Sequence, residues 1–78
     1  MMILSMDSSN RKVFGAKIRS LRSDKGWTQE ELAERTGLHP SYIGGIERGQ
    51  RNVGFDNILK LAWALDTTPS DLFEGLSG

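Results

Sequence analysis

The chain has 78 residues, with ten Lys and Arg, ten Asp and Glu, and no cysteine. A chain of this length forms one small domain, close to the lower limit for an independent hydrophobic core. Without cysteine it can hold neither a disulfide nor a thiolate metal site, and this composition suits the reducing cytoplasm, where we expect the protein to act.

The first segment, MMILSM, is mostly apolar and is followed by Asp7. It lacks the basic start of a signal peptide and the length of a membrane span, so we expect neither, and no membrane partner. We expect residues 1–10 to be a disordered or expression-derived tail, and residues 11–78 to form the folded domain.

A first helix is predicted over about 11–25, with Ser9 or Asn10 as its N-cap and Gly26 at its end. The helical spacing of three apolar residues gives it one buried stripe. That stripe consists of Phe14, Ile18 and Leu21.

A second helix is predicted to begin at the sequence TQEE, which has the pattern of a capping box. The Thr28 hydroxyl would accept the Glu31 amide, and the Glu31 side chain would reach back to the amide of Thr28. Leu32 and Ala33 would face inward, and Gly37 would end the helix after about two turns.

A third helix is predicted to begin near His39, with Pro40 at the first helical position, where its missing N–H costs nothing. Ile43 and Ile46 would form its buried side, and Gly49 its C-terminal end. Ala33, Gly37 and Ile43 have the spacing of a small residue at a helix crossing, a glycine turn and an apolar residue beneath a second helix. The sequence therefore predicts a helix-turn-helix.

A fourth helix is predicted over about 55–65, and a short fifth helix at TTPSDLF, where Thr68 caps and Pro69 takes the first position. The inner stripe of the fourth helix is Ile58, Leu61, Ala62 and Leu65. With no strand pattern along the chain, we predict an all-α fold of five helices.

The fourth helix carries a second apolar line, at successive steps of four residues, which the core does not need. We interpret it as a partner surface, most simply a homodimer interface; the alternatives are that the domain core uses it or that it is merely exposed. The residues are Phe55, Leu59 and Trp63, with Leu76 from the end of the chain nearby.

The formal net charge is zero, which is atypical of a nucleic-acid-binding protein, but the charges are unevenly distributed. Basic residues gather over 11–25 and again at Arg48 and Arg51, whereas acidic residues gather over 30–34 and 66–74. We therefore expect one basic and one acidic side.

The segment TQEELAERTGLHPSYIGGIERGQRN resembles the Xre/Cro-type helix-turn-helix family, and the resemblance extends over about 14–73. Within that family, SYIGGIERGQRN is most similar to the controller proteins of restriction–modification systems. The resemblance implies a compact, phage-repressor-like DNA-binding domain. It also implies a dimeric regulator that binds a partly palindromic operator in double-stranded DNA, possesses no cofactor, and both activates and represses transcription, including that of its own gene.

In this family the third helix enters the major groove and reads bases with its N-terminal half. The residues that the resemblance places there are His39, Pro40, Ser41, Tyr42, Gly44 and Gly45. Those that it places at the DNA backbone or groove are Thr28, Gln29, Arg48, Gln50, Arg51 and Asn52. The family's glutamine at position 29 also braces the neighbouring helix.

Gly44 and Gly45 lie inside a helix, where each costs about 1 kcal/mol relative to alanine. At position 44 related proteins often carry a polar side chain. We interpret the pair as exposed positions that allow the backbone close to the bases; the alternative is that the glycines are merely tolerated.

Glu47 is an acid on a helix that is expected to face phosphates. In the family this position pairs with an arginine of the first helix, here Arg22, so we predict a structural ion pair. Glu30 and Glu34 on the second helix are candidates for contact with RNA polymerase, with ordinary surface charge as the equal alternative.

A protein-interaction module, such as an antitoxin-type helix-turn-helix protein, is the alternative function, since the zero net charge and the second apolar line both suit it. Enzyme function is not expected. His39 is the only histidine, and the chain shows neither metal-ligand spacing nor a glycine-rich phosphate loop.

Overall fold

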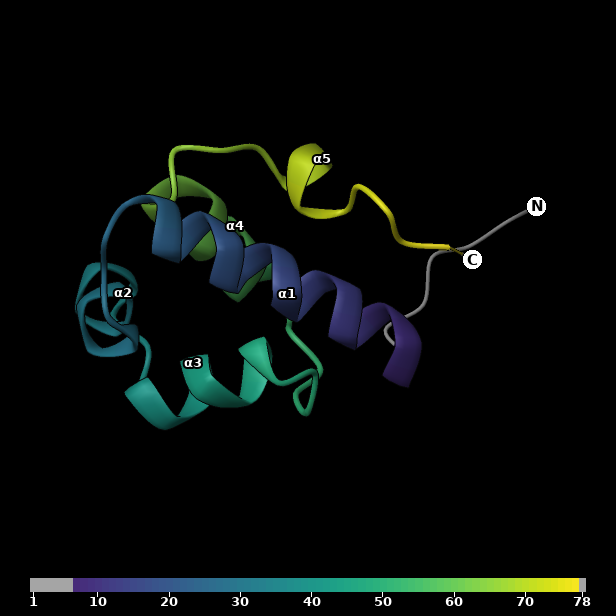
Figure 1. The fold of residues 1–78 in the computed structure, drawn as a ribbon, viewed down its shortest axis with the longest axis horizontal. Helices are drawn as coiled ribbons and strands as arrows, with labels where there is room; N and C mark the ends of the chain where they lie inside the picture. Colours follow the sequence, from purple (N-terminus) through teal and green to yellow (C-terminus); the bar gives the residue numbers. More distant parts are fainter. Residues whose placement is uncertain (1–6, 78) are drawn as a thin grey trace.

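A computed structural model describes residues 7–77, and within them every regular element is a helix (Figure 1). This confirms the predicted all-helical fold. No helix in that part of the chain combines the length and the apolar character needed to cross a membrane. The five helices are α1 (Ser8–Asp24), α2 (Gln29–Thr36), α3 (Pro40–Glu47), α4 (Phe55–Ala64) and α5 (Pro69–Leu72).

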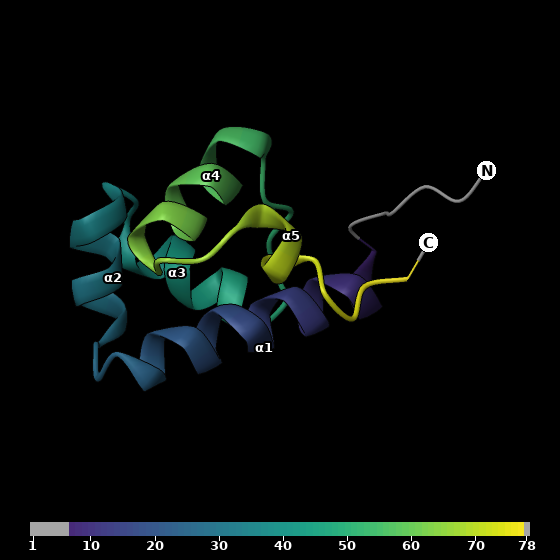
Figure 2. The same cartoon turned by 90° about the horizontal axis from the view of Figure 1, so that it is seen from above.

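The long helix α1 runs along the molecule, with α3 against one side of it and α5 against another (Figures 1 and 2). Helix α2 packs on α3 and α4, and α4 packs on α5. The side chains that these helices turn inward form one apolar core. Its fully buried members are Phe14, Ile18, Leu32, Ile43, Ile46, Leu61 and Leu72.

Helix α1 begins earlier than predicted. Its N-cap is Asp7, whose carboxylate accepts the backbone amide of Asn10 at 2.9 Å, so the prediction of Ser9 or Asn10 as the cap is wrong. A carboxylate at this position satisfies a free amide and also meets the positive end of the helix dipole. Residues 8–10 are therefore helical and do not belong to a tail; residues 1–6 lie outside the described part of the chain.

The first turn of α1 is tied to the end of the described chain. Asn10 is only 3% exposed; its side-chain amide donates to the Ser77 carbonyl at 2.6 Å and accepts the Ser77 amide at 3.0 Å. The segment after α5 thus leads towards the start of α1 rather than along α4 (Figure 1). Leu76 in this segment is half-buried against the core, and its part in a partner surface with Trp63 stays a prediction.

The remaining start and stop signals are confirmed. Thr28 and Glu31 form the predicted capping box, and Thr68 accepts the amide of Asp71 at 3.1 Å. Gly37 ends α2 with a φ of 74°, a conformation that residues with a side chain rarely adopt. These signals are local, which explains why the sequence alone predicts them well.

Gly15 allows α1 and α3 to touch through their backbones. A methyl group on Gly15 would overlap the carbonyl oxygen of Ile46 and would lie 2.8 Å from that of Glu47. The close crossing of these helices therefore needs a residue without a side chain. It fixes the end of α3 against α1, and no pattern in the sequence near Gly15 indicates it.

Candidate nucleic-acid interface

Helix α3 carries the proposed base-reading residues, and its N-terminal end projects from the outer side of the molecule, below α1 in Figure 1. His39, Pro40 and Ser41 are all exposed. The turn before them is held by a backbone hydrogen bond, in which the Leu38 amide donates to the Ala33 carbonyl at 3.1 Å. The structure thus places the start of α3 on a surface that a ligand can reach.

His39 caps α3 with its imidazole ring. The Ser41 amide donates to His39 Nδ1 at 3.1 Å, and the Ser41 hydroxyl lies 2.8 Å from the same nitrogen. A backbone amide can donate only to a ring nitrogen without a proton, so the capping form of His39 is neutral, with its proton on Nε2. This arrangement leaves a hydrogen-bond donor on the exposed side of the ring.

Tyr42 has a structural contact that the sequence did not predict. The residue is half-buried against the core, and its hydroxyl accepts a hydrogen bond from Asn57 Nδ2 at 3.2 Å. Because Asn57 belongs to α4, this bond joins α3 to α4. That the Tyr42 ring reads bases stays a prediction.

The glycine pair is covered, although we expected it to be exposed. Both residues are buried. A methyl group on Gly44 would lie 3.0 Å from Arg48 Nη1 and 3.3 Å from Gln29 Oε1, and a methyl group on Gly45 would lie 2.8 Å from Arg51 Cγ. Long polar side chains from the same surface therefore fill the space that the glycines leave.

The residues after α3 form a polar, basic group at its C-terminal end. Arg48, Gln50, Arg51 and Asn52 are all exposed, and Arg48 Nε donates to Gln50 Oε1 at 3.1 Å. Helix α1 adds to this group, because Arg11 Nε donates to the Gly49 carbonyl at 3.4 Å. Thr28 is exposed at the start of α2. The structure thus brings the predicted DNA-backbone residues to the two ends of the helix-turn-helix.

The predicted ion pair between Arg22 and Glu47 is present and lies beneath this surface. Arg22 Nε donates to Glu47 Oε2 at 2.7 Å and a second guanidinium nitrogen donates to Oε1 at 3.0 Å. The two side chains are only 13% and 2% exposed. The hydrogen bond and the charge of Glu47 raise the pKa of Arg22, against the opposing effect of burial, so the guanidinium stays charged at any ordinary pH.

Two further hydrogen bonds connect this pair to α2 and to the turn that precedes it. Arg22 Nη1 donates to the Trp27 carbonyl at 2.7 Å, and Gln29 Nε2 donates to Glu47 Oε1 at 3.0 Å. Gln29 therefore braces the neighbouring helix, as the family resemblance implies. The pair joins α1, α2 and α3, and this hydrogen-bond network fixes the orientation of α3 relative to the other two helices.

We expect Glu47→Gln to lower the free energy of unfolding by about 2 kcal/mol, because each orientation of the new amide places an NH2 group against an Arg22 or Gln29 donor. Urea unfolding followed by circular dichroism measures the loss. Glu34→Gln, which makes the same change at an exposed position of α2, is the matched control and should leave stability unchanged. Equal stability of both variants would show that the pair contributes nothing net.

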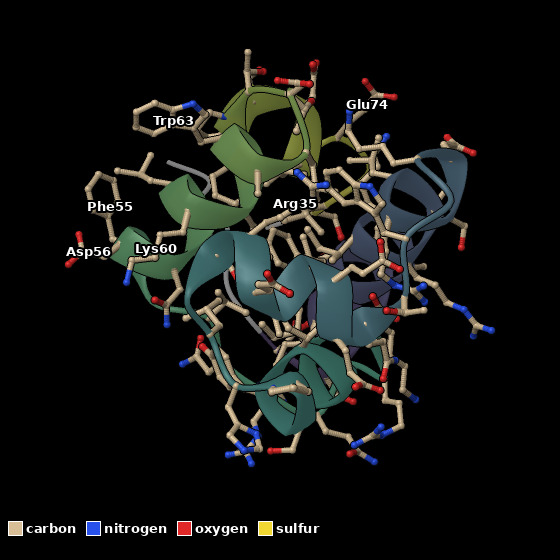
Figure 3. All side chains as sticks on the ribbon, turned by 90° about the vertical axis from the view of Figure 1, so that its left-hand side faces the viewer. Arg35, Phe55, Asp56, Lys60, Trp63 and Glu74 are labelled. Carbon is tan, nitrogen blue, oxygen red and sulfur yellow. The ribbon has the colours of Figure 1, made fainter. Side chains whose placement is uncertain are left out.

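A second surface lies on α4. Phe55, Leu59 and Trp63 are 73%, 41% and 85% exposed, so the core does not use this line. Figure 3 shows Phe55 and Trp63 projecting from α4, with Asp56 and Lys60 nearby, on a different side of the molecule from α3.

The acidic residues proposed for contact with RNA polymerase, Glu30 and Glu34, are exposed on α2. Within residues 7–77 no cluster of His, Asp and Glu is arranged to hold a metal ion.

Comparison with known proteins places this geometry among DNA-binding regulators. Residues 18–72 match the family model described as helix-turn-helix. The chain is 46% identical over 70 residues to control protein C.BamHI of Bacillus amyloliquefaciens. The matched region covers 88% of this chain and 86% of that protein.

Solved structures of regulators are similar to this chain as well. The restriction-modification controller protein C.AhdI from Aeromonas hydrophila has a TM-score of 0.81 at 55% identity, over 83% of this chain and 98% of that chain. SinR, a regulator of biofilm formation solved in complex with DNA, has a TM-score of 0.75 at 32% identity, over 78% of this chain and 98% of that chain.

Proposed function

The chain belongs to the Xre-type helix-turn-helix family, and from that premise we propose that it binds a partly palindromic operator in double-stranded DNA as a homodimer. It is a DNA-binding transcriptional regulator similar to restriction–modification controller proteins, and not an enzyme. The observation that carries the proposal is the exposed start of α3 beside the arginines that follow it.

In the proposed complex, α3 lies in the major groove and presents His39, Pro40 and Ser41 to the base edges. The hydroxyl of Ser41 and the exposed Nε2–H of His39 supply the hydrogen-bonding groups. Arg48 and Arg51 meet the phosphates or the groove walls, so local positive charge compensates for the zero net charge of the chain.

The homodimer rests on the outer line of α4. An exposed apolar line of three large side chains is a typical protein-interaction surface, and a two-fold axis beside it would pair it with itself. Because this line and α3 lie on different sides of the molecule, a dimer would leave both recognition helices free. Two such helices would read half-sites about one turn of DNA apart.

The resemblance to controller proteins supports autoregulation, with activation at one site and repression at another, in the cytoplasm. For activation, we propose that the exposed carboxylates of Glu30 and Glu34 contact RNA polymerase. Both lie on α2, beside but outside the ion-pair network, so they are available to a second partner while α3 is in the groove.

The experiment that tests this function is selection of duplexes from a random pool, followed by gel shifts of the selected duplex and a scrambled one at rising salt. We expect one partly palindromic consensus that outcompetes the scrambled duplex at every salt concentration. Weak binding without a consensus would instead favour the protein-interaction module, for which the exposed α4 line would be the partner site.

We expect Ser41→Ala to weaken binding to the selected duplex about tenfold and to leave binding to scrambled DNA unchanged, because a base contact carries sequence information. The variant keeps the capping bond from the backbone amide of residue 41 to His39 and loses the 2.8 Å contact between the Ser41 hydroxyl and His39 Nδ1. Ser70→Ala is the matched control, since Ser70 follows a cap and a proline in α5 just as Ser41 does in α3. An equal loss on both duplexes would contradict base reading by Ser41.

A further inference from the structure

Arg51 lies across the bare backbone of Gly45. A methyl group on Gly45 would lie 2.8 Å from Arg51 Cγ, 3.1 Å from Nε and 3.5 Å from Cδ. The contact therefore extends along the side chain from its stem towards the guanidinium. Gly45 is buried although it lies in a surface helix, and it owes this burial to a residue outside that helix.

Arg51 also lies near the ring of Tyr42, whose centroid is 5.9 Å from the guanidinium carbon. Residues 42 and 45 are three positions apart, so they lie on the same face of α3. The guanidinium thus lies over a face of the helix that includes both residues. It occupies space into which a side chain at position 45 would otherwise project.

We propose that Gly45 positions Arg51, so that a guanidinium supplied by the following loop serves as the functional group of this face of α3. The proposal rests on the proposed DNA-binding function and names one of its specificity-determining devices. In this proposal the glycine makes room for a side chain of the free protein. Close approach of the bare backbone to the bases would matter only in the complex with DNA.

The position of the contact along Arg51 makes the proposal testable. Cγ is the second carbon of the side chain, so a methyl group at 2.8 Å is relieved only by rotation near the backbone, which swings the whole guanidinium away. Gly54, at the start of α4, is not among the residues named for DNA contact, and a methyl group on it would have no atom within 4 Å, so Gly54→Ala is the matched control.

The first experiment is a double-mutant cycle of Gly45→Ala and Arg51→Ala, with the duplex selected from the random pool as the probe. We expect each single variant to bind about tenfold more weakly, and the double variant to bind no more weakly than Arg51→Ala alone. Gly54→Ala should bind within about threefold of the wild type. Circular dichroism should show that Gly45→Ala is folded, because alanine favours a helix more than glycine does and the close contact is with a side chain outside the helix.

Two results would overturn the proposal. If Gly45→Ala loses affinity equally with and without the Arg51 side chain, the methyl group itself meets the DNA and the glycine serves close approach. If Gly45→Ala binds as the wild type does, the position of Arg51 on this face is not needed for binding.

A second measurement needs no DNA. In NMR spectra of the free wild-type protein, we expect nuclear Overhauser contacts between the Gly45 α-protons and the Arg51 side chain, and we expect Gly45→Ala to lose them. Their absence from the wild type would reject the positioning. If the protein selected no duplex at all, the DNA function would fail, while these spectra would still decide the place of Arg51.

Discussion

Trp63→Glu is expected to give a folded monomer that binds the selected duplex at least about a hundredfold more weakly than the wild type. Trp63 is 85% exposed, so its replacement removes no core contact and the fold should persist. If the Phe55–Leu59–Trp63 line forms the dimer interface, two glutamates would meet near the two-fold axis, partly desolvated and without partners.

The loss of affinity would be large because dimerisation links the two half-sites. When one recognition helix of a dimer is bound, its partner is held at a high effective concentration beside the second half-site. A monomer lacks this advantage and holds one half-site alone. The effect should therefore be much smaller on a duplex that contains a single half-site.

Sedimentation, circular dichroism and gel shifts on this variant separate the outcomes. Ser20→Glu adds the same charge at an exposed position of α1, a different helix from the one that carries Trp63, and should remain a dimer with normal affinity. A folded Trp63→Glu dimer with normal binding would reject the proposed interface. A wild-type monomer that still binds tightly would reject it as well.

Gly15→Ala is expected to lower the free energy of unfolding by about 3 kcal/mol or more. Helix propensity alone predicts the opposite sign, because alanine is favoured over glycine in a helix interior by about 1 kcal/mol. The methyl group, however, would overlap the Ile46 carbonyl oxygen. Backbone atoms of two packed helices cannot move aside as a side chain can, so α1 and α3 must separate.

Urea unfolding followed by circular dichroism measures this loss. Ser20→Ala, which raises the helix propensity of α1 on its exposed side, is the matched control and should be at least as stable as the wild type. Because the contact fixes the end of α3, Gly15→Ala should also weaken DNA binding even where the variant is folded. A variant as stable as the wild type would mean that the helices can separate at no cost.

The sequence predicted those features whose cause is local. The capping box at Thr28, the proline after His39 and the glycine at position 37 each act within a few residues, and the structure confirms all three. The ion pair of Arg22 and Glu47 is a different case, since its partners are far apart in the chain. It was predicted from the family resemblance and not from the residues themselves.

The features that the sequence missed depend on how distant segments meet. Nothing near Gly15 in the sequence indicates that the backbone of α3 will lie against it. The cover over Gly45 comes from Arg51, which lies beyond the end of the helix, so helical periodicity gave no sign of it. The cap at Asp7 was missed because a tail was expected there, and Asn10, a candidate N-cap from the sequence, is instead a buried residue of the first turn of α1.

The two hydrogen bonds between Asn10 and Ser77 join residues 67 positions apart and so close most of the described chain into a ring. Neither segment can fray alone without breaking bonds that the other also needs. Ordering so long a loop costs conformational entropy, which the core, and not these two bonds, must offset. The first turn of α1 and the last described residues therefore behave as one unit of local unfolding. Fraying of either segment lowers the free energy that is needed to open the other.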